Sequence, residues 1–216
     1  MVVAALTETP ATETPVTTLD ELVAVVGEPI PRVRDKVRDR LHDLDRQWLA
    51  ASPFCVLASS DAEGRLDTSP KGDPAGQLVH VLDETTLAIA ERPGNRRVDG
   101  YKNVLANPHV GLIFLIPGRD DTLRVNGRAR LVSDAPWFDD MRVKGSRPIL
   151  GLVVEVEEVF THCAKAFLRA QLWHPETWEP ESTPSRAVVA HTFERADQSL
   201  AEVEQHYGPT YGEQLY

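Results

Sequence analysis

The chain has 216 residues, of which 42% are hydrophobic and 26% charged, a balance typical of a globular protein with a sizeable core. Its net charge of −10 argues against a nucleic-acid partner, because contacts to phosphates require a basic face. Apolar runs are too short for a membrane span, and no basic residue precedes Arg32. We therefore expect neither a membrane anchor nor a signal peptide, and a cytoplasmic location by default.

The N-terminal part predicts two helices after a mobile leader over residues 1–17, which are rich in Thr, Pro and Glu. Thr18 and Glu21 have the spacing of a capping box, and Gly27 is a stop signal. A second, longer helix is expected after Pro31, because apolar residues recur at helical spacing: Val33, Val37, Leu41, Leu44 and Trp48. Residues 18–52 would form this helical segment.

From residue 54 the pattern changes to extended segments joined by short turns: FCVLASS, RLDTSPKG, QLVHVLD, TTLAIAE, HVGLIFLIP, TLRVNGRARLVSD and ILGLVVEVEEVFTH. A short helix over RVDGYKNVLA and another after Asp134 interrupt them. Six or so consecutive strands with few central helices predict a mainly β (α+β) fold, an antiparallel barrel over residues 53–174.

The C-terminal part follows the last strand. CAKAFLRAQLW predicts one or two helical turns that place Lys165 and Arg169 on one face. Residues 175–192 are typical of a linker, and FERADQSLAEVEQHYG predicts a final helix. Residues 175–216 would form a separate C-terminal segment.

The stretch AIAERPGNRRVDGYKN places two adjacent arginines at a strand-to-helix turn of an acidic chain. Asn95 offers neutral donors, Arg96 and Arg97 offer forked charged donors, and a helix start adds free amides, a set that suits an anion such as phosphate. The alternative is a surface turn in which Asp99 or Glu91 pairs with the arginines. The local sequence leaves both interpretations open.

Two further groups of residues suit a ligand, although each also has a structural explanation. The strand end LDTSPKG offers hydroxyls and Lys71 as a wall for a planar polar ligand, or is simply a strand edge ended by Pro70 and Gly72. Lys165, Arg169 and Trp173 form a cationic and aromatic patch that suits a phosphorylated or aromatic ligand, or they lie over the barrel surface.

Standard catalytic and metal motifs do not occur in the chain. Neither CxxC nor HExxH nor a phosphate-binding glycine loop is present, so we expect no metal site and assign no catalytic residue. Cys55 and Cys163 are too few for a disulfide framework, and Cys55 in its apolar run is expected to be a buried thiol.

Taken in order, these segments resemble the pyridoxamine 5'-phosphate oxidase-like family of FMN-binding split barrels over about residues 30–178. AIAERPGNRRVDGYKNVLANPHVGLIFL resembles that family's phosphate segment, TLRVNGRARLV its next strand, and DTSPKG the strand along the flavin ring. SPKGDPAG, RPGNRR, LRVNGRARL and CAKAFLRAQLW together resemble a bacterial subgroup of FMN-dependent enzymes whose substrate is unassigned. The Arg-x-His signature of true pyridoxamine phosphate oxidases is absent, because the chain reads LWHPETW, which argues against vitamer oxidation.

The resemblance implies a six-stranded Greek-key split barrel with flanking helices, a homodimer, and two FMN sites at the interface. Residues implied to contact FMN in one chain are Thr68, Ser69, Pro70, Lys71, Ile89, Ala90, Asn95, Arg96, Arg97 and Thr122. Lys165, Arg169 and Trp173 would come from the partner chain.

The leading hypothesis is an FMN-dependent oxidoreductase that moves a hydride or electrons between the flavin and a small organic substrate. A flavin-binding or flavin-sensing protein without turnover is the second hypothesis. The third is a split barrel that binds haem or a deazaflavin instead.

Overall fold

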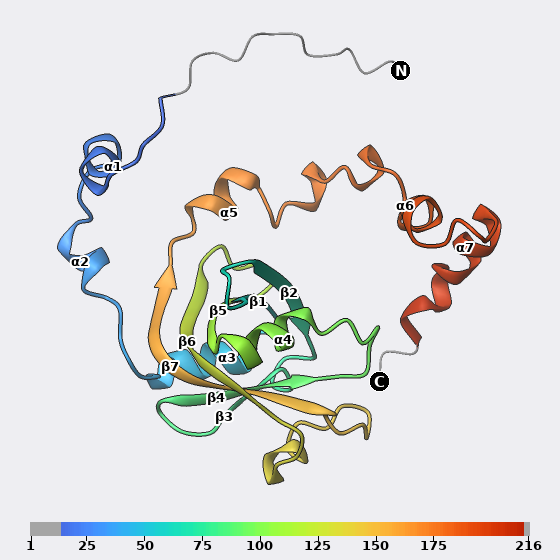
Figure 1. Ribbon diagram of the computed structural model, residues 1–216, viewed down its shortest axis with the longest axis horizontal. Coiled ribbons are helices and arrows are strands. Elements are labelled where there is room, and N and C mark those ends of the chain that lie inside the picture. The colour runs from blue at the N-terminus through green and yellow to red at the C-terminus, as the bar shows by residue number, and fades with distance from the viewer. Residues whose placement is uncertain (1–13, 214–216) are drawn as a thin grey trace. The chain divides into compact units, whose positions relative to one another are not determined.

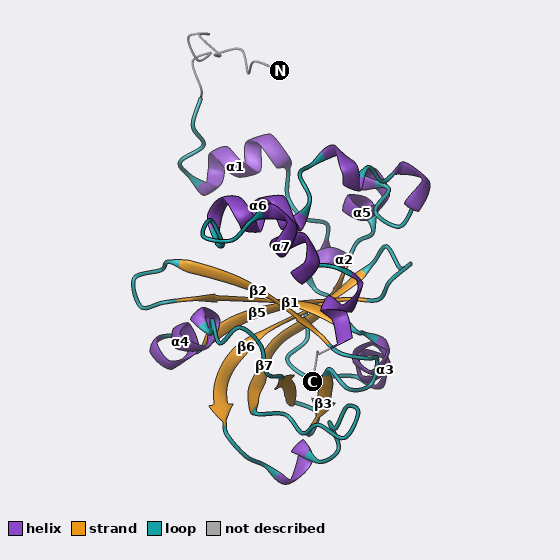
Figure 2. Cartoon of the chain, turned by 90° about the vertical axis from the view of Figure 1, so that its right-hand side faces the viewer, coloured by secondary structure: helices purple, strands orange, loops and turns teal. Residues whose placement is uncertain are grey.

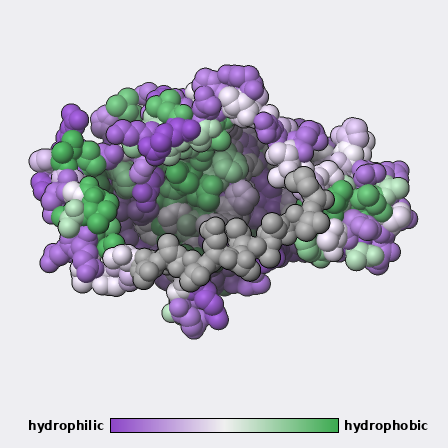
Figure 3. Space-filling model, turned by 90° about the horizontal axis from the view of Figure 1, so that it is seen from above, coloured by the Kyte–Doolittle hydropathy of each residue, from purple (hydrophilic) through white to green (hydrophobic). Residues whose placement is uncertain are grey.

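The computed structural model describes residues 14–213, and the chain divides into two units, Met1–Lys36 and Val37–Tyr216. Most of the expected leader lies outside the described residues. The first unit holds α1 (Leu19–Val26) and α2 (Pro31–Arg34). As predicted, the Thr18 side chain accepts a hydrogen bond from the Glu21 backbone N–H at 3.2 Å, and Gly27 ends α1 with φ +81°. Four apolar side chains of α1 are exposed, those of Leu19, Leu22, Val25 and Val26. Figure 3 shows in green where hydrophobic residues lie on one face of the molecular surface.

In the second unit, the described residues form one sheet of seven strands in the order β2-β1-β5-β6-β7-β4-β3 (Figures 1 and 2). Every neighbouring pair is antiparallel, and the sheet is a half-barrel with flanking helices, as the sequence predicts. The strands are β1 (Phe54–Ser60), β2 (Leu66–Gly72), β3 (Val79–Val81), β4 (Thr86–Glu91), β5 (His109–Leu115), β6 (Thr122–Val132) and β7 (Leu150–His162). The predicted number of six is too low, because even the three residues of β3 pair with β4 in a hairpin at the sheet edge.

Strand alternation builds the core. In β1 and β5 every second residue is buried, and Leu57, Phe114, Leu123 and Val154 from four strands are at most 1% exposed. The helix α4 (Asp99–Ala106) packs against β1, β2 and β6 and ends at Asn107, as expected. The side chains of Asn103 and Asn107 donate hydrogen bonds to the hydroxyls of Ser59 and Ser60 in β1. These bonds hold the second half of α4 against the sheet.

The prediction of one long helix after Pro31 is wrong. Only α2 at its start and Asp43–Ala51 at its end, α3, are helical, and the segment between them is irregular because Arg38 exchanges two backbone hydrogen bonds with Val159 of β7. The guanidinium of Arg38 then pairs with the buried carboxylate of Asp45 at 2.9 Å, and Asp45 also accepts from the His42 backbone N–H. Pairing with the sheet therefore outweighs the helical periodicity of this segment.

Other helical predictions are correct in part. The α5 helix (Lys165–Ala170) lies where it was expected, but only the 3₁₀ turn η1 (Pro136–Phe138) follows Asp134, whose carboxylate pairs with Arg147. The segment expected to be a linker contains η2 (Pro175–Thr177), η3 (Pro180–Ser182) and most of α6 (Arg186–Phe193). The final helix predicted over residues 193–208 is shorter than expected: α7 (Leu200–His206) forms there because Ser199 caps its start, and η4 (Pro209–Glu213) follows.

The helices α6 and α7 pack on each other through a small apolar cluster of Ala187, Ala190, Val203 and Tyr207. Among the described residues, no helix combines the length and the apolar character needed to cross a membrane.

The bulge in β6 explains one glycine of the predicted strand. The register between β6 and β7 shifts at Asn126/Gly127, and a Cβ at Gly127 would overlap the backbone carbonyl of Glu155.

We predict that Gly127→Ala lowers the free energy of unfolding by about 1–3 kcal/mol, because the sheet must shift to accommodate the methyl group. Urea denaturation measures this change. Gly212→Ala is the matched control, since its Cβ would meet no described atom within 4 Å. Equal stability of the two variants would contradict the packing argument.

Candidate functional site

A cavity of about 450 Å³ opens where β2, the end of β4, the following loop and the start of α4 meet. Its lining joins the LDTSPKG strand and the RPGNRR turn, which lie far apart in the sequence. The lining residues are Leu57, Asp67, Thr68, Ser69, Pro70, Lys71, Glu91, Asn95, Arg97, Val98, Asp99, Gly100 and Tyr101. Two of the groups that sequence reasoning singled out therefore form one site.

Strand β2 supplies one wall of this cavity. It is an edge strand of the sheet and pairs only with β1. In this pairing, Leu57 lies opposite Ser69 and Cys55 lies opposite Lys71. Alternation places Asp67, Ser69 and Lys71 on the half-buried face. These three polar side chains thus share one side of the strand, beside the start of α4, while Thr68 and Pro70 lie on its exposed side at the rim of the cavity.

A buried ion pair anchors the loop after β4. The Arg92 guanidinium lies 2.9 Å from the Asp73 carboxylate and 2.7 Å from the Met141 carbonyl oxygen, which it donates to. The side chains of Arg92 and Asp73 are 10% and 1% exposed. Because Asp73 directly follows β2, this pair ties the two walls of the cavity together.

The loop then turns tightly into α4. The Asn95 side-chain oxygen accepts a hydrogen bond from the Arg97 backbone N–H at 2.9 Å, and Arg96 between them takes φ +63°, a conformation that few residues other than glycine adopt. At the helix start, Val98 provides no side-chain cap to any described residue. The Tyr101 amide donates to the Val98 carbonyl oxygen at 3.0 Å, so the Asp99 and Gly100 amides are the first ones of α4 that remain available beside Asn95 and Arg97.

Arg97 pairs with an acidic residue, one of the two possibilities that the sequence left open. Its guanidinium lies 2.6 Å from the Asp99 carboxylate, and the Arg97 side chain is 80% exposed. The hydrogen bonds from Arg97 and then Lys102 lower the pKa of Asp99, so this carboxylate is charged at neutral pH. An anion that binds Arg97 must compete with Asp99.

Three further side chains form a cluster in the wall, which we call the Lys71 cluster: Lys71, Glu91 and Tyr101. The Lys71 ammonium lies 2.6 Å from one Glu91 oxygen, and the Tyr101 hydroxyl donates to the same oxygen. The ammonium also lies 4.4 Å from the centre of the Tyr101 ring. Burial and then the hydrogen bond to Glu91 raise the pKa of Tyr101, so that its phenol stays protonated.

Several residues that the resemblance implied do not line this cavity. Ile89 and Ala90 are 0% and 4% exposed in the core part of β4, and Arg96 lies in the loop without lining the cavity. Thr122 is 2% exposed at the start of β6, and its hydroxyl makes no hydrogen bond to any described residue. The structure therefore does not bring these four residues to the cavity.

The three residues expected to reach the site from the partner chain also do not line the cavity of the chain to which they belong. Lys165 and Arg169 belong to α5, and the Trp173 indole N–H donates to the Arg119 carbonyl oxygen at 2.7 Å.

Sequence reasoning missed Tyr101 and Asp67 and gave Glu91 the wrong partner. It offered Glu91 as a partner of the arginines, whereas Glu91 pairs with Lys71 of a strand that is not its hydrogen-bonded neighbour. The sequence did not single out Tyr101 as a site residue, because a tyrosine in an amphipathic helix usually belongs to the core. One signal was available: Glu91 is a charged residue directly after the apolar run of β4.

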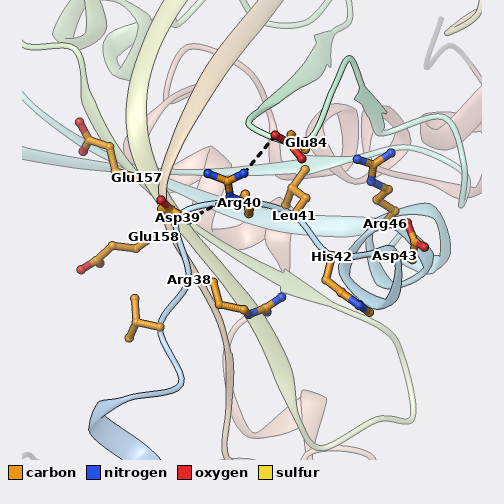
Figure 4. A pocket seen from close by; sticks show the side chains of 11 residues that line it. Arg38, Asp39, Arg40, Leu41, His42, Asp43, Arg46, Glu84, Glu157 and Glu158 are labelled. Carbon is orange, nitrogen blue, oxygen red and sulfur yellow. Dashed lines mark hydrogen bonds and ion pairs between the residues drawn. The ribbon is translucent and has the colours of Figure 1, made fainter.

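A larger cavity, of about 820 Å³, lies near α3 and the end of β7 (Figure 4). Charges of both signs alternate around it, and pairs such as Arg40 with Glu84 at 3.2 Å satisfy part of its lining. We place the candidate site in the smaller cavity, because only there do a lysine, an arginine and uncapped helix amides converge. Within residues 14–213, no group of three or more His, Cys, Asp or Glu side chains could hold a metal ion.

Residues 41–163 match the family model described as pyridoxamine 5'-phosphate oxidase, and this match spans more than half of the chain, from α3 to the end of β7. The chain belongs to the pyridoxamine 5'-phosphate oxidase family. The resemblance in the motifs is therefore confirmed. The helices α6 and α7 lie outside the part that matches the family.

Solved structures similar to this chain have low sequence identity to it. They include HupZ from Group A Streptococcus, with 17% identity, a TM-score of 0.44, and coverage of 56% of this chain and 93% of its own. A putative pyridoxamine 5'-phosphate oxidase from Lactobacillus delbrueckii has 23% identity, a TM-score of 0.44, and coverage of 57% and 95%. An FMN-binding protein from Syntrophomonas wolfei has 14% identity, a TM-score of 0.41, and coverage of 56% and 89%. No curated protein shows significant similarity to the chain.

We predict that Cys55 resists alkylation of the native protein at pH 8 while Cys163 reacts. Cys55 is buried beside Lys71, and burial raises the pKa of its thiol to about 12, so the reactive thiolate is scarce, whereas Cys163 is exposed. Mass spectrometry after iodoacetamide treatment distinguishes the two sites, and denatured protein is the control in which both react. Equal labelling of both cysteines in the native protein would refute the burial of Cys55.

Proposed function

We propose that this protein is an FMN-dependent oxidoreductase that moves a hydride or electrons between bound flavin and a small organic substrate. One observation carries the proposal: a single cavity joins the polar face of β2 to the Asn95–Arg97 turn and the start of α4. The wall formed by β2 suits a planar polar ring, and the wall formed by the Asn95–Arg97 turn and the start of α4 suits a phosphate. Family membership supports the same assignment, and one solved structure similar to this chain is described as an FMN-binding protein.

The donors in the cavity fit a phosphate. Arg97 offers a forked charged donor, Asn95 a neutral one, and the uncapped amides of α4 add a partial positive charge. Asp99 opposes this binding, so the phosphate would replace its carboxylate as the partner of Arg97. Arg96, next in the chain, would supply a second positive charge by turning towards the phosphate.

The residues of β2 fit the other end of the ligand. Thr68 and Ser69 offer hydroxyls, Pro70 an apolar surface, and Lys71 a positive charge. When bound, FMN supplies the ring that exchanges electrons with the substrate. The chain's own share is to orient this ring and to favour negative charge on it through Lys71.

We further propose that the protein is a homodimer with a site at each end of the interface. Lys165 and Arg169 are exposed and do not line the cavity of their own chain, so a partner can contact them, and Trp173 would offer its ring while its indole N–H stays bonded to Arg119. The outer face of the sheet also carries a groove whose lining includes Val56, Ile113 and other apolar residues.

Sedimentation velocity tests this proposal, with an expected mass of twice 24.0 kDa. A monomer that holds FMN fully would contradict the proposed interface site.

We predict that Arg96→Ala/Arg97→Ala weakens FMN binding about 10- to 100-fold, because charge-assisted hydrogen bonds to the phosphate are lost. Fluorescence titration of the apoprotein with FMN measures the change, and riboflavin, which lacks the phosphate, should bind both proteins equally. Arg32→Ala/Arg34→Ala is the matched control, since it removes the same charge from exposed residues of the first unit.

An opposite variant sharpens this experiment. Asp99→Asn removes the competing carboxylate and should tighten FMN binding about two- to fivefold, the range of an exposed ion pair. Unchanged FMN affinity in the arginine double variant would reject the phosphate assignment.

A flavin-binding protein without turnover is the second candidate. One observation favours it: no histidine is among the described residues that line the cavity, and Glu91 is already engaged by Lys71 and Tyr101. Anaerobic addition of NADH or NADPH to the FMN-loaded protein separates the two candidates. Reduction followed by reoxidation with a small acceptor supports the enzyme, and a flavin that neither cofactor reduces supports the passive binder.

A further inference from the structure

The Lys71 cluster joins three elements at the cavity wall. Lys71 comes from β2, Glu91 ends β4, and Tyr101 lies in the first turns of α4. The Lys71 and Glu91 side chains are only 12% and 21% exposed, and Tyr101 is 4% exposed. The cluster is therefore largely removed from water but open to the cavity that its members line.

Contacts in the cluster restrict the Lys71 ammonium strongly. A lysine side chain normally retains much rotational freedom, because its stem is long and its charge is well hydrated. Here one Glu91 oxygen holds the ammonium at 2.6 Å and also accepts from the Tyr101 hydroxyl. The Tyr101 ring lies under the same ammonium at 4.4 Å. Glu91 is thus fixed by two donors, and it fixes Lys71 in turn.

Glu91 also sets the charge of the wall. The phenol of Tyr101 is neutral, and so is the Cys55 thiol that faces Lys71 from β1. The positive charge of Lys71 is therefore offset by Glu91 alone within the cluster. A buried ion pair is no more stabilising than well-packed apolar side chains, so stability alone does not explain its place at the cavity wall.

We infer that Glu91 and Tyr101 are positioning residues that fix the Lys71 ammonium at the cavity wall and set the net charge that a bound flavin meets there. This inference rests on the proposed function, because it assigns roles towards the same ligand. Loss of the Glu91 charge leaves Lys71 uncompensated and favours reduced, anionic flavin. Loss of the Tyr101 hydroxyl leaves the Glu91 carboxylate less screened and disfavours it.

The midpoint potential of bound FMN tests the charge effect in the full-length protein. Glu91→Gln should shift the ratio of reduced to oxidised flavin about tenfold towards the reduced form, or about 30 mV for a two-electron couple. Tyr101→Phe should shift it to a smaller extent in the opposite direction. Glu63→Gln, in the exposed turn between β1 and β2, should leave it unchanged.

The critical outcome is that Glu91→Gln and Tyr101→Phe shift the midpoint potential in opposite directions. If both variants only disturbed the structure, the potential would move in the same direction in both or not at all. An unchanged potential in Glu91→Gln, or shifts of the same sign, would overturn the inference.

A second readout needs no flavin. The ammonium signal of Lys71 in a ¹⁵N NMR spectrum, identified by its loss in Lys71→Arg, should be protected in the wild type, lost in Glu91→Gln and retained in Tyr101→Phe. An unaltered signal in Glu91→Gln would show that Glu91 does not position Lys71. If FMN fails to bind the wild-type protein, the proposed function fails, and this spectrum alone decides the positioning role of Glu91.

Discussion

The buried pair of Arg92 and Asp73 is the interaction on which the candidate site depends. Asp73 follows β2 and Arg92 follows β4, and these two strands are not neighbours in the sheet. Together with the pair of Lys71 and Glu91, this buried pair fixes the strand that carries Lys71 relative to the loop that carries Arg97. Arg92 also donates to the Met141 carbonyl, so the segment after β6 takes part in the same anchor. The SPKGD and RPGNRR segments are thus one structural unit, although 19 positions separate the paired residues.

Charge compensation follows from this arrangement. The anchor brings acidic and basic residues together in a small volume, where Lys71 pairs with Glu91 and Arg97 with Asp99. The two pairs differ in their surroundings: the first is largely buried, whereas the second is exposed. In the proposed function, an incoming phosphate would therefore displace Asp99 at low cost, whereas the Lys71 pair would persist as part of the wall. This difference would separate an end of the cavity that binds the phosphate from an end that sets the charge beside the flavin ring.

Much of the fold could be predicted from the sequence, because its signals are local. The alternation in β1 and β5, the capping box at Thr18 and the end of α4 at Asn107 each depend on a few adjacent residues. The failed helix around Arg38 shows the limit. Its apolar spacing is helical, but backbone pairing with Val159, more than 100 positions away, determines its conformation. The start of α7 likewise depends on Ser199 as a cap rather than on continuous periodicity.

The candidate site could be predicted only in part for the same reason. The sequence singled out Asn95 and Arg97 as a candidate anion site and Lys71 as a charged residue at a strand end. That these residues share a cavity with Tyr101, and that Glu91 serves Lys71 rather than an arginine, depends on contacts across β2, β4 and α4. Thr122 is a residue that the resemblance implied but that the structure does not bring to the cavity, because it is buried at the start of β6.

The identity of the cofactor that the purified protein carries is the most direct test of the account. Absorbance of the native protein, followed by mass spectrometry of the compound that denaturation releases, measures it. The account predicts a flavin spectrum and the mass of FMN, with the phosphate retained. A Soret band, or a released compound without a phosphate, would contradict the central claim that the Asn95–Arg97 turn holds the phosphate of a flavin.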